Sequence, residues 1–505
     1  MDATPFLRLY SRLRRRRLAE LNPQESQEAI LRRLLHQAGN TRFGRDHGFA
    51  GIRTVQDFQA AVPLRHYEDF WEAYWKDAFP LLDDVSWPGR IPWFAVTSGT
   101  TSGKTKYIPV TDRMLASNRK AGLDVITWHL QAHPESRLFA GKSFMLGGST
   151  ALEEEAPGVY SGDISGIITG AMPWWGNLFA FPDKQLALLS DWEEKLERTA
   201  KASLEADIRS LSGTPSWLLI LLERARELND GKTPYPNLEL LAHGGVNFEP
   251  YRARFERLLA DTPASFREVY PASEAFIAAA DAGPYDGLRL NLDHDVFYEF
   301  VPVEELDSDS PTRHWIGNVE TGVNYAIAVS SCAGAWAYLI GDTVRFASLD
   351  PPRLFVTGRT AYSLSAFGEH LIAEEVENAV AGAANSAGLG VSDYSLGAIF
   401  PDENRDKGHH RIYIEFERLP EEAQAQRFGE ELDRLLKEEN DDYAAHRAGG
   451  TGMGAPEVRP VPPGTFAAWM KKRGRLGGQN KVPRLVSDPE LFADLQEFCE
   501  LAAER

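Results

Sequence analysis

The sequence is poor in cysteine, with only Cys332 and Cys499 among 505 residues. Two cysteines form neither a disulfide framework nor a metal cluster, and such sparse use fits a reducing compartment. The sequence also has no apolar run near the ~18 residues that a membrane-spanning helix needs. No apolar segment follows the arginine-rich N-terminus, so a secretory signal is not indicated. These absences predict a cytoplasmic protein without a membrane partner.

Positive charge is in deficit as well. The 54 Lys and Arg residues against 73 Asp and Glu give a formal net charge of −19, which argues against nucleic acid as the main partner. A nucleotide remains compatible, because a local cluster of donors can hold phosphate in an acidic protein. Basic residues gather at Arg8, Arg12 and Arg14 to Arg17. We interpret this run as the polar face of a surface helix.

The chain is long and apolar enough for more than one core. Hydrophobic residues make up 43% of it and 12 are Trp, and at ~150 residues per domain about three units are expected. Apolar strand patterns alternate with helical patterns, which predicts a parallel α/β architecture with ligand loops at the carboxyl ends of strands. The expected strands include 238–248, 266–279 and 296–306, and the expected helices include 1–60, 111–129, 182–229 and 249–260.

A domain boundary is expected near Gly358. We predict a large N-terminal domain over residues 1–357, with β-sheets flanked by helices, and a small α+β C-terminal domain over 358–505. The C-terminal part contains two strand patterns, at 394–400 and 411–417, followed by a helical pattern at 420–438. The predicted fold class is therefore α/β with a second, smaller domain.

Residues 97–109, TSGTTSGKTKYIP, are the most informative stretch. Apolar residues on both sides predict a strand, a polar loop and a second strand. Glycines let backbone N–H groups turn toward an anion, hydroxyls donate further hydrogen bonds, and Lys104 or Lys106 adds charge. A Walker A loop is rejected, because Gly99 and Gly103 enclose three residues where that motif needs four. A polyphosphate-binding loop and a solvated hairpin turn both remain open.

Three later segments extend this pattern: YPASEA, YLIGD and GGQNKVPR (477–484). In this order the four segments resemble the adenylate-forming enzyme superfamily. Within it, the chain resembles the Gretchen Hagen-3 type acyl-acid amido synthetases, in their bacterial form. The resemblance covers nearly the whole chain and includes VPLRHYEDFW, WFAVTSGTTSGKTKYIPVT, FGEHL and PPGTFAAWMKKRGRLGGQNKVPRL.

The resemblance implies an ATP site. The β- and γ-phosphates would be held by Ser98, Gly99, Thr100, Thr101, Ser102 and Gly103, with Lys104 or Lys106 adding charge. Gly244 and Gly245 would lie against the adenine and the α-phosphate, and Tyr270 would stack on the adenine. Asp342 would accept the ribose hydroxyls, and Arg359 would also reach the ribose.

It also implies three groups at the reacting centre. Ser273 would bind the α-phosphate, and Glu274 would coordinate Mg²⁺ as a hard oxygen ligand. Lys481 would meet the carboxylate and the α-phosphate oxygens. The sequence departs from the family twice, since Ala275 stands where plant members have Gly, and Ala361 stands where the superfamily has a charged hinge residue.

The implied activity is that of an ATP-dependent ligase. It would adenylate a carboxylic acid, release pyrophosphate and transfer the acyl group to an amine, an amino acid in the family, with rotation of a mobile C-terminal domain between the halves. Acyl-CoA formation and a catalytically silent nucleotide-binding protein stay open as alternatives. Residues 112–180, with Met172, Trp174 and Trp175, are expected to shape a partly apolar acid site. The acid, the amine and the oligomeric state are not indicated, and a monomer is compatible with the sequence.

Overall fold

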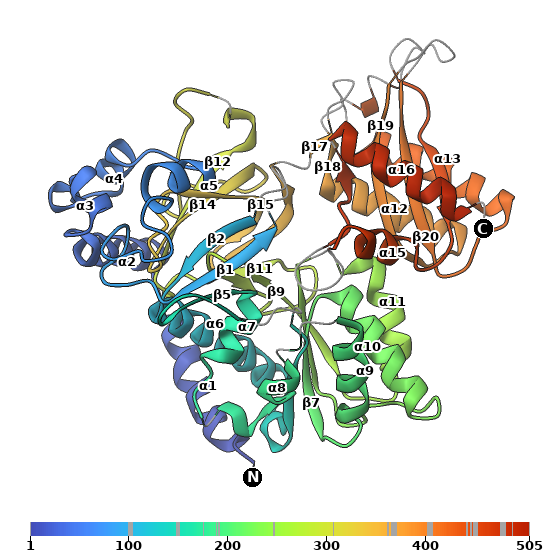
Figure 1. Cartoon of the computed structure of the whole chain (residues 1–505), viewed down its shortest axis with the longest axis horizontal. Coiled ribbons are helices and arrows are strands. Elements are labelled where there is room, and N and C mark those ends of the chain that lie inside the picture. The colour runs from blue at the N-terminus through green and yellow to red at the C-terminus, as the bar shows by residue number, and fades with distance from the viewer. Residues whose placement is uncertain are drawn as a thin grey trace. The chain divides into compact units, whose positions relative to one another are not determined.

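A computed structural model of the chain describes residues 2–98, 105–147, 152–174, 176–187, 189, 192–245, 248–306, 308–360, 363–364, 371–400, 408–440, 443–444, 447, 453–474, 481–486 and 488–503. The chain divides into two compact units (Figure 1). Unit 1 holds residues 1–246 and 258–356, and unit 2 holds residues 247–257 and 357–505. Within the described residues, no helix combines the length and apolarity that crossing a membrane requires.

Unit 1 contains most of a 12-stranded mixed sheet. The spatial order is β13 (His314–Trp315), β12 (Val296–Pro302), β14 (Asn324–Ser331), β15 (Tyr338–Leu349), β16 (Pro352–Arg359), β11 (Leu288–Leu290), β10 (Phe276–Ala279), β9 (Ser265–Pro271), β8 (Leu240–Gly244), β7 (Ile208–Gly213), β3 (Lys142–Met145) and β6 (Ala180–Phe181). Strands β6, β3, β7, β8 and β9 run parallel. The sheet turns antiparallel from β9 to β10. The predicted α/β class is confirmed, and the parallel arrangement holds for this half of the sheet.

A second, four-stranded sheet of unit 1 has the order β2-β1-β5-β4. Its strands are β1 (Trp93–Ser98), β2 (Thr105–Val110), β4 (Glu153–Ala156) and β5 (Val159–Gly162). Strands β1 and β2 pair antiparallel in a register that places Ser98 opposite Thr105. The predicted strand–loop–strand pattern is confirmed for the two strands, which flank residues 99–104 on either side.

Helices pack against the larger sheet, with α2 against β12, α6 against β10 and α10 against β7. The α-helices up to residue 258 are α1 (Thr4–Ala19), α2 (Pro23–Ala38), α3 (Arg42–Asp46), α4 (Val55–Ala61), α5 (Tyr67–Phe70), α6 (Asp112–Ala132), α7 (Ile164–Gly170), α8 (Lys184–Ala187), α9 (Trp192–Ser203), α10 (Pro215–Leu228) and α11 (Glu249–Leu258). Their starts follow the sequence: Thr111 caps α6 by accepting a hydrogen bond from the Met114 N–H. Its hydroxyl also donates to the Cys332 carbonyl at 2.8 Å, which fixes the helix start to the core.

One strand of unit 1 contradicts the sequence prediction. Residues 182–229 were expected to be helical, but Ile208–Gly213 form β7 between β3 and β8. The segment is short and carries two serines, so its pattern does not stand out from the helices around it. In the sheet, the Ser210 hydroxyl donates to the Ser143 hydroxyl of β3 at 2.7 Å. A polar residue can therefore occupy a buried strand because its neighbour supplies a partner.

Unit 2 is an α+β structure, as predicted for the C-terminal part. Its sheet has the order β21-β20-β19-β22, and β17 and β18 form a separate pair. The strands are β17 (Ser363–Leu364), β18 (Leu371–Ile372), β19 (Val391–Ile399), β20 (His409–Phe416), β21 (Glu457–Val461) and β22 (Leu485–Val486). The helices are α12 (Ala373–Ala387), α13 (Glu422–Glu439), α15 (Thr465–Lys472) and α16 (Pro489–Ala503). Helices α12 and α13 pack together, and both contribute to a core with β19 and β20.

Arg14 points into unit 1, unlike its neighbours in the N-terminal arginine run. Its side chain is 4% exposed. The guanidinium donates two hydrogen bonds to Asp124, both at 2.7 Å, and two to Asp293, at 2.7 and 2.8 Å. The His294 ring nitrogens lie 3.1 Å from each carboxylate, although neither aligns for a hydrogen bond. The expectation that the whole run forms a polar surface is therefore wrong for Arg14, which shares the buried face of α1 with Ser11.

Replacing Arg14 by Met should lower the free energy of unfolding of the protein by about 3–5 kcal/mol, because two buried carboxylates lose their partner. Burial opposes ionisation of Asp124 and Asp293, but the hydrogen bonds from Arg14 outweigh it and lower both pKa values below 3.8. A depressed pKa stabilises the folded state above pH 3.8 and ceases to do so as the pH falls through the folded value. In urea unfolding, the difference in the free energy of unfolding between the wild type and Arg14→Met should therefore become smaller as the pH falls into the acid range.

The matched control is Arg15→Met, which changes an exposed neighbour in the same helix. Its unfolding free energy should stay within about 0.5 kcal/mol of the wild-type value. Equal losses in the two variants would contradict the assignment of Arg14 as the buried clamp.

Candidate active site

Tyr270 and Asp342 come together although 72 residues separate them in the chain. Tyr270 lies at the end of β9 and is buried, and Asp342 lies in β15 and is half-buried. The Tyr270 hydroxyl donates a hydrogen bond to Asp342 Oδ2 at 2.7 Å. A hydroxyl that donates to a carboxylate makes a strong, directional contact. The contact fixes the position of a carboxylate for which the sequence predicted a ligand-binding role.

Glu274 interacts with the buried Tyr338. Burial, together with the charge and hydrogen bonding of the nearby Glu274 carboxylate, raises the pKa of Tyr338 well above its ordinary value. Tyr338 therefore stays protonated. Each of the two segments, YPASE (270–274) and YLIGD (338–342), begins with Tyr and ends with an acid. The tyrosine of each contacts the acid of the other, and we call this arrangement the reciprocal pair. The sequence analysis overlooked Tyr338.

Ser273 and Glu274 lie in the tight turn that joins β9 to β10. The Ala272 N–H donates to the Ala275 carbonyl at 2.8 Å, which closes the turn. Ser273 is buried and Glu274 is half-buried. The turn therefore presents a hydroxyl and a carboxylate at the point where the sheet changes from parallel to antiparallel. Ala275 is fully buried, so this departure from the family pattern fills core space.

Gly244 and Gly245 follow the neighbouring strand, β8. Gly244 lies opposite Val269 in the parallel register, next to Tyr270. A Cβ on Gly244 would be 2.1 Å from the Val269 carbonyl oxygen, so this position cannot carry a side chain. Gly245 has a φ of 88°, which favours glycine. Gly244 is therefore packed against β9 next to Tyr270, and Gly245 is exposed at the carboxyl end of β8.

The segment that starts at Arg65 joins β2 to the reciprocal pair. The Arg65 N–H donates to the Ala337 carbonyl at 3.0 Å, and the Leu339 N–H donates to the Arg65 carbonyl at 2.9 Å. Two residues on, the Tyr67 hydroxyl accepts a hydrogen bond from the Tyr107 N–H at 2.9 Å. Residues next to Tyr338 are thereby tied to the strand that follows residues 99–104.

Lys106 faces this segment. Its Nζ lies 3.6 Å from a Glu68 carboxylate oxygen and 5.3 Å from the centre of the Tyr67 ring. Of the two lysines proposed from the sequence to add charge to the phosphate loop, Lys106 is thus placed beside Tyr67. Lys104 lies outside the described residues, as do Gly99, Thr100, Thr101, Ser102 and Gly103. Ser98 is described as the last residue of β1, by its backbone alone.

Unit 2 carries the two remaining predicted site residues. Arg359 ends β16 and is half-buried, and Lys481 is exposed in the segment before β22. Three residues after Lys481, Arg484 donates to the Tyr251 hydroxyl oxygen at 2.8 Å. The Ser395 hydroxyl donates to the Pro483 carbonyl at 2.7 Å. These contacts within unit 2 anchor the backbone that leads away from Lys481. Arg484 belongs to the NKVPR segment, but its anchoring role is not evident from sequence.

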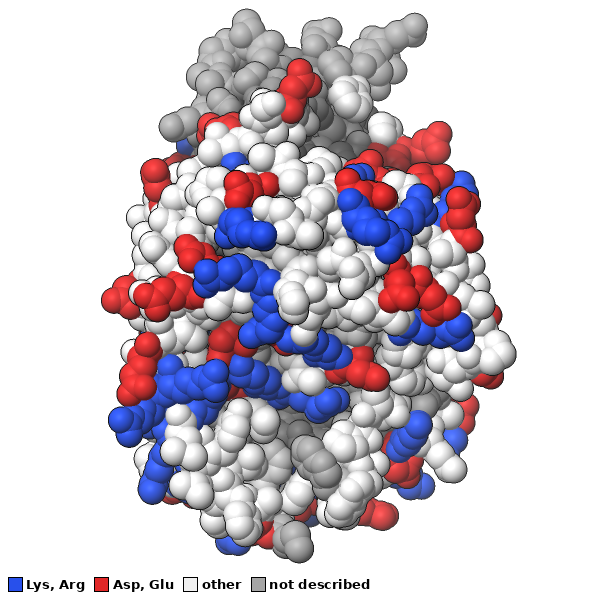
Figure 2. Space-filling model, turned by 90° about the vertical axis from the view of Figure 1, so that its left-hand side faces the viewer, with Lys and Arg blue, Asp and Glu red and all other residues white. Residues whose placement is uncertain are grey.

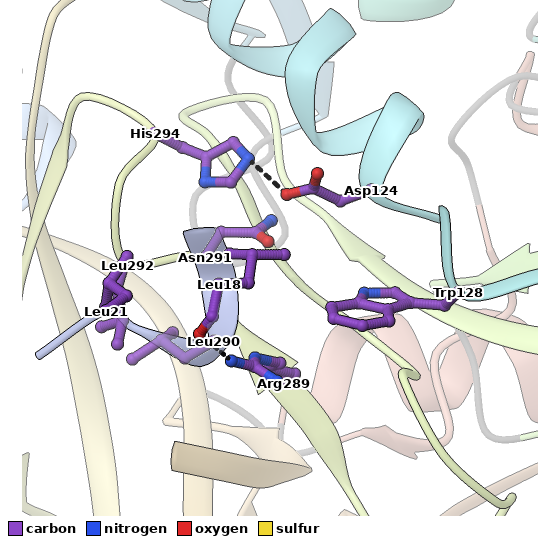
Figure 3. A pocket seen from close by; sticks show the side chains of 9 residues that line it. All are labelled: Leu18, Leu21, Asp124, Trp128, Arg289, Leu290, Asn291, Leu292 and His294. Carbon is purple, nitrogen blue, oxygen red and sulfur yellow. Dashed lines mark hydrogen bonds and ion pairs between the residues drawn. The ribbon is translucent and has the colours of Figure 1, made fainter. Parts of the chain in front are cut away.

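A separate small pocket lies under α1, α6 and the segment after β11 (Figure 3). Its lining includes Trp128 and Asp124 but no residue predicted for the site, and it has room for only a water-sized solute. Asp124, Asp293 and His294 present ligand atoms within 4.8 Å of one another. Because the Arg14 guanidinium already bonds both carboxylates, a cation would have to displace it. We therefore assign this group as an ion-pair network.

The chain matches family models along most of its length. The GH3 family N-terminal domain matches residues 12–159 and 150–264. The GH3 family central domain matches residues 290–359, and the GH3 family C-terminal domain matches residues 374–490.

Two curated relatives illustrate the likeness. Jasmonoyl–L-amino acid synthetase JAR4 of Nicotiana attenuata is 22% identical over 544 residues, which cover 92% of this chain and 91% of that protein. A probable indole-3-acetic acid-amido synthetase, GH3.9 of Oryza sativa subsp. japonica, is 28% identical over 218 residues. The second match covers 40% of this chain and 48% of the relative, so the chain spans about half the length of that protein.

Solved structures share the fold. The AtGH3.15 acyl acid amido synthetase in complex with 2,4-DB superposes with a TM-score of 0.77 at 19% identity, covering 95% of this chain and 94% of that chain. A 2-hydroxyisobutyryl-CoA ligase in the postadenylation state gives a TM-score of 0.61 at 17% identity, covering 94% and 91%. The predicted architecture, with large sheets flanked by helices, is confirmed by these matches.

Tyr338→Phe should loosen the turn at 271–275, because it removes the hydroxyl that holds Glu274. Losing a hydrogen bond worth about 1–1.5 kcal/mol should make local opening of the turn about 5- to 10-fold more frequent. Hydrogen–deuterium exchange of the peptide that contains this turn should accelerate accordingly.

Tyr298→Phe is the matched control. Tyr298 is equally buried, but its hydroxyl has no hydrogen-bond partner among the described residues. The same chemical change there should leave exchange at 271–275 unaltered. Equal exchange in wild type and Tyr338→Phe would show that the reciprocal pair does not hold the turn.

Proposed function

The chain belongs to the GH3 family, and we propose on this premise that it is an ATP-dependent acyl-acid amido synthetase. It adenylates a carboxylic acid and conjugates the acyl group to an amine, which we take to be an amino acid. The observation that carries the proposal is the reciprocal pair, which gathers Tyr270, Glu274 and Asp342 around one edge of the sheet. These are an aromatic ring and two carboxylates, the groups that an adenine, a metal ion and a ribose require.

The residues at this edge fit ATP. We propose that the adenine lies against the exposed backbone at Gly245, next to Tyr270. Asp342 accepts a hydrogen bond from Tyr270 through Oδ2, and a carboxylate has further acceptor sites for the ribose hydroxyls. Arg359 is proposed to reach the ribose from unit 2, and the loop 98–104 to hold the β- and γ-phosphates, with Lys106 adding charge.

The site also fits Mg²⁺. Glu274 supplies a hard carboxylate oxygen, and its contact with Tyr338 occupies only part of its acceptor capacity. A magnesium ion held there would neutralise charge on the phosphate oxygens. The protein's own part is to orient Glu274, through Tyr338, toward the phosphates. We propose that Ser273, one residue earlier, donates its hydroxyl to the α-phosphate.

In the first half-reaction, a carboxylate oxygen of the acid attacks the α-phosphorus of ATP. The bond between this phosphorus and the bridging oxygen breaks, and pyrophosphate leaves with the electron pair. Lys481 is proposed to donate to the carboxylate and α-phosphate oxygens, which lowers their mutual repulsion. Tyr270 and Asp342 keep the nucleoside in place, so that the attacking and leaving oxygens can lie in line.

In the second half-reaction, the nitrogen of an unprotonated amine attacks the acyl carbon of the acyl-adenylate. The carbon–oxygen bond to the phosphate breaks, AMP leaves with the electron pair, and the nitrogen loses a proton to solvent. We propose that residues 358–505 form a domain that moves between the two half-reactions. Lys481 of this domain is then needed in the first half-reaction. Gly358 has a φ of 150° next to Arg359, and Ala361 lies outside the described residues.

The acid site is proposed to include residues that follow α7. Met172 and Trp174 follow α7 (Ile164–Gly170), and Trp174 is 77% exposed, so the ring is available to a ligand rather than committed to the core. Trp175 lies outside the described residues. We propose a partly apolar acid, a cytoplasmic setting and, from the likeness of the long segments, a bacterial form of the family.

Glu274→Ala should abolish adenylation. Carboxylate-dependent exchange of labelled pyrophosphate into ATP, measured over a broad panel of acids, should fall at least about 100-fold, since a group at the phosphates contributes roughly 3 kcal/mol to the transition state. The matched control is Glu304→Ala, an exposed carboxylate of unit 1, which should keep full exchange. If folded wild-type protein gives no exchange with any acid, or releases ADP and phosphate, the adenylation proposal fails.

The acceptor is tested by product analysis. With the acid that supports exchange, the protein should form amides from an amino-acid mixture and little thioester from CoA. Predominant acyl-CoA would assign the alternative function, a CoA ligase on the same adenylate. Tight nucleotide binding without either product would assign the catalytically silent protein.

Lys481→Ala should impair the first half-reaction, adenylation, and leave the second, amide formation, largely intact. Because Lys481 is proposed to act on the attacking carboxylate, pyrophosphate exchange should fall about 100-fold or more. Conversion of chemically made acyl-adenylate and amino acid to amide should stay within about threefold of the wild-type rate. The control is Lys472→Ala, an exposed lysine of α15 in the same unit. An equal fall in the rates of pyrophosphate exchange and of amide formation would show that Lys481 does not act in adenylation alone.

A further inference from the structure

The outward face of α1 carries an apolar stripe that no described residue covers. Phe6, Leu9 and Leu13 are 79%, 60% and 65% exposed. Their spacing of three and four residues places them on one side of the helix. The opposite side faces unit 1, where Ser11 and Arg14 are buried. Single exposed apolar residues are common, but three on one stripe of one helix form a patch.

Arg12, Arg16 and Arg17 lie on the sides of this stripe, whereas Arg15 lies about 150° away from it around the helix axis. Arg12, Arg15, Arg16 and Arg17 are exposed on the same helix. Arg16 pairs with Glu20, whereas Arg12, Arg15 and Arg17 form no ion pair with any described residue. Figure 2 shows the side of the molecule on which α1 to α4 lie in Figure 1, with Lys and Arg side chains gathered in bands across it. The exposed arginines of α1 therefore form a local concentration of positive charge in a chain whose net charge is −19.

We propose that α1 docks on the surface of an anionic lipid bilayer. A helix with Phe and Leu on one face and arginines beside them lies in the plane of the interface. The apolar side chains enter the boundary between headgroups and acyl chains, while the guanidinium groups meet lipid phosphates. Surface docking needs no spanning helix, so it is consistent with the absence of one among the described residues, but it departs from the sequence-based expectation of no membrane partner.

A second copy of the chain fits this face less well. A two-fold interface places the same patch against itself, so the unpaired arginines of one copy would lie against those of the other. Nucleic acid fits less well too, because the stripe presents hydrocarbon where a sugar–phosphate backbone needs donors. A bilayer surface satisfies both parts of the patch at once, since it offers hydrocarbon below and negative charge above.

The buried face of α1 lets the helix bind without unfolding. Arg14 is bonded to Asp124 of α6 and to Asp293. The outward side chains make no contact that this clamp needs. Substitutions on the stripe should therefore leave the fold intact, which makes the proposal testable in the full-length protein and independent of the proposed ligase activity.

The test is flotation with vesicles of phosphatidylcholine, either alone or with about one-third phosphatidylglycerol, at low and at physiological salt. The wild-type protein should float with the anionic vesicles only, and less at higher salt. The triple variant Phe6→Ser, Leu9→Ser, Leu13→Ser should partition at least about tenfold less. Arg12→Glu and Arg17→Glu should each lower partitioning more than fivefold, because about fivefold is expected for the loss of one positive charge and each variant reverses a charge.

The matched controls are Tyr285→Ser, which removes an exposed aromatic residue of unit 1 that is 70% exposed, and Arg427→Glu, which reverses an exposed charge on α13. Both should bind anionic vesicles like the wild type, and thermal unfolding should show all variants folded. The proposal is overturned if the wild-type protein ignores anionic vesicles at low salt, or if the α1 variants bind as well as the controls. A concentration-dependent oligomer that the triple variant abolishes would assign the stripe to a second copy instead.

Discussion

Two tyrosine hydroxyls hold the carboxylates on which the proposed chemistry depends. A half-buried Asp or Glu at the edge of a sheet can adopt several rotamers and can turn toward water. Tyr270 removes that freedom for Asp342 by donating a hydrogen bond to it, and the buried Tyr338 interacts with Glu274 across the two segments. The contacts run in opposite directions between the two segments, so neither segment can slide along the other without breaking both. The backbone pairing at Arg65 adds a third tie to the same place.

The change of strand direction in the larger sheet explains why these groups meet there. The parallel strands β8 and β9 end at the same edge, which places Gly244 beside Tyr270. The chain then reverses through the turn at 271–275 and returns antiparallel as β10. A crossover helix at this point would have carried the chain away over one face of the sheet. The tight reversal instead leaves Ser273 and Glu274 at the edge, close to the strand end that bears the Tyr270 ring.

Sequence reasoning predicted the α/β class and both strands around residues 97–109, because apolar alternation and glycine-rich breaks are local signals. It missed β7, where Ser210, whose hydroxyl bonds to the neighbouring strand, takes the place of an apolar residue. It also overlooked Tyr338 and Arg484, whose partners lie far away in the chain and so leave no local pattern. Arg14 was misplaced for a similar reason, since one arginine in a run of four looks like its neighbours until the helix phase is known. The roles of the candidate residues rest on the family resemblance, and the structure adds which of them are neighbours.

Helix α1 has a buried face and an exposed apolar face, and the geometry of the helix fixes the angle between them. The clamp at Arg14 sets its rotation, and this rotation alone decides that Phe6, Leu9 and Leu13 face outward. Deleting any one residue between Leu13 and Leu18 would remove one of four consecutive arginines and barely change the composition. The three remaining arginines would keep their phase relative to the stripe, but Leu18 and the residues after it would move around the helix axis by about 100°, away from the buried face. A sequence comparison that counts arginines would score such a deletion as minor, whereas in three dimensions it puts the helix out of phase with itself.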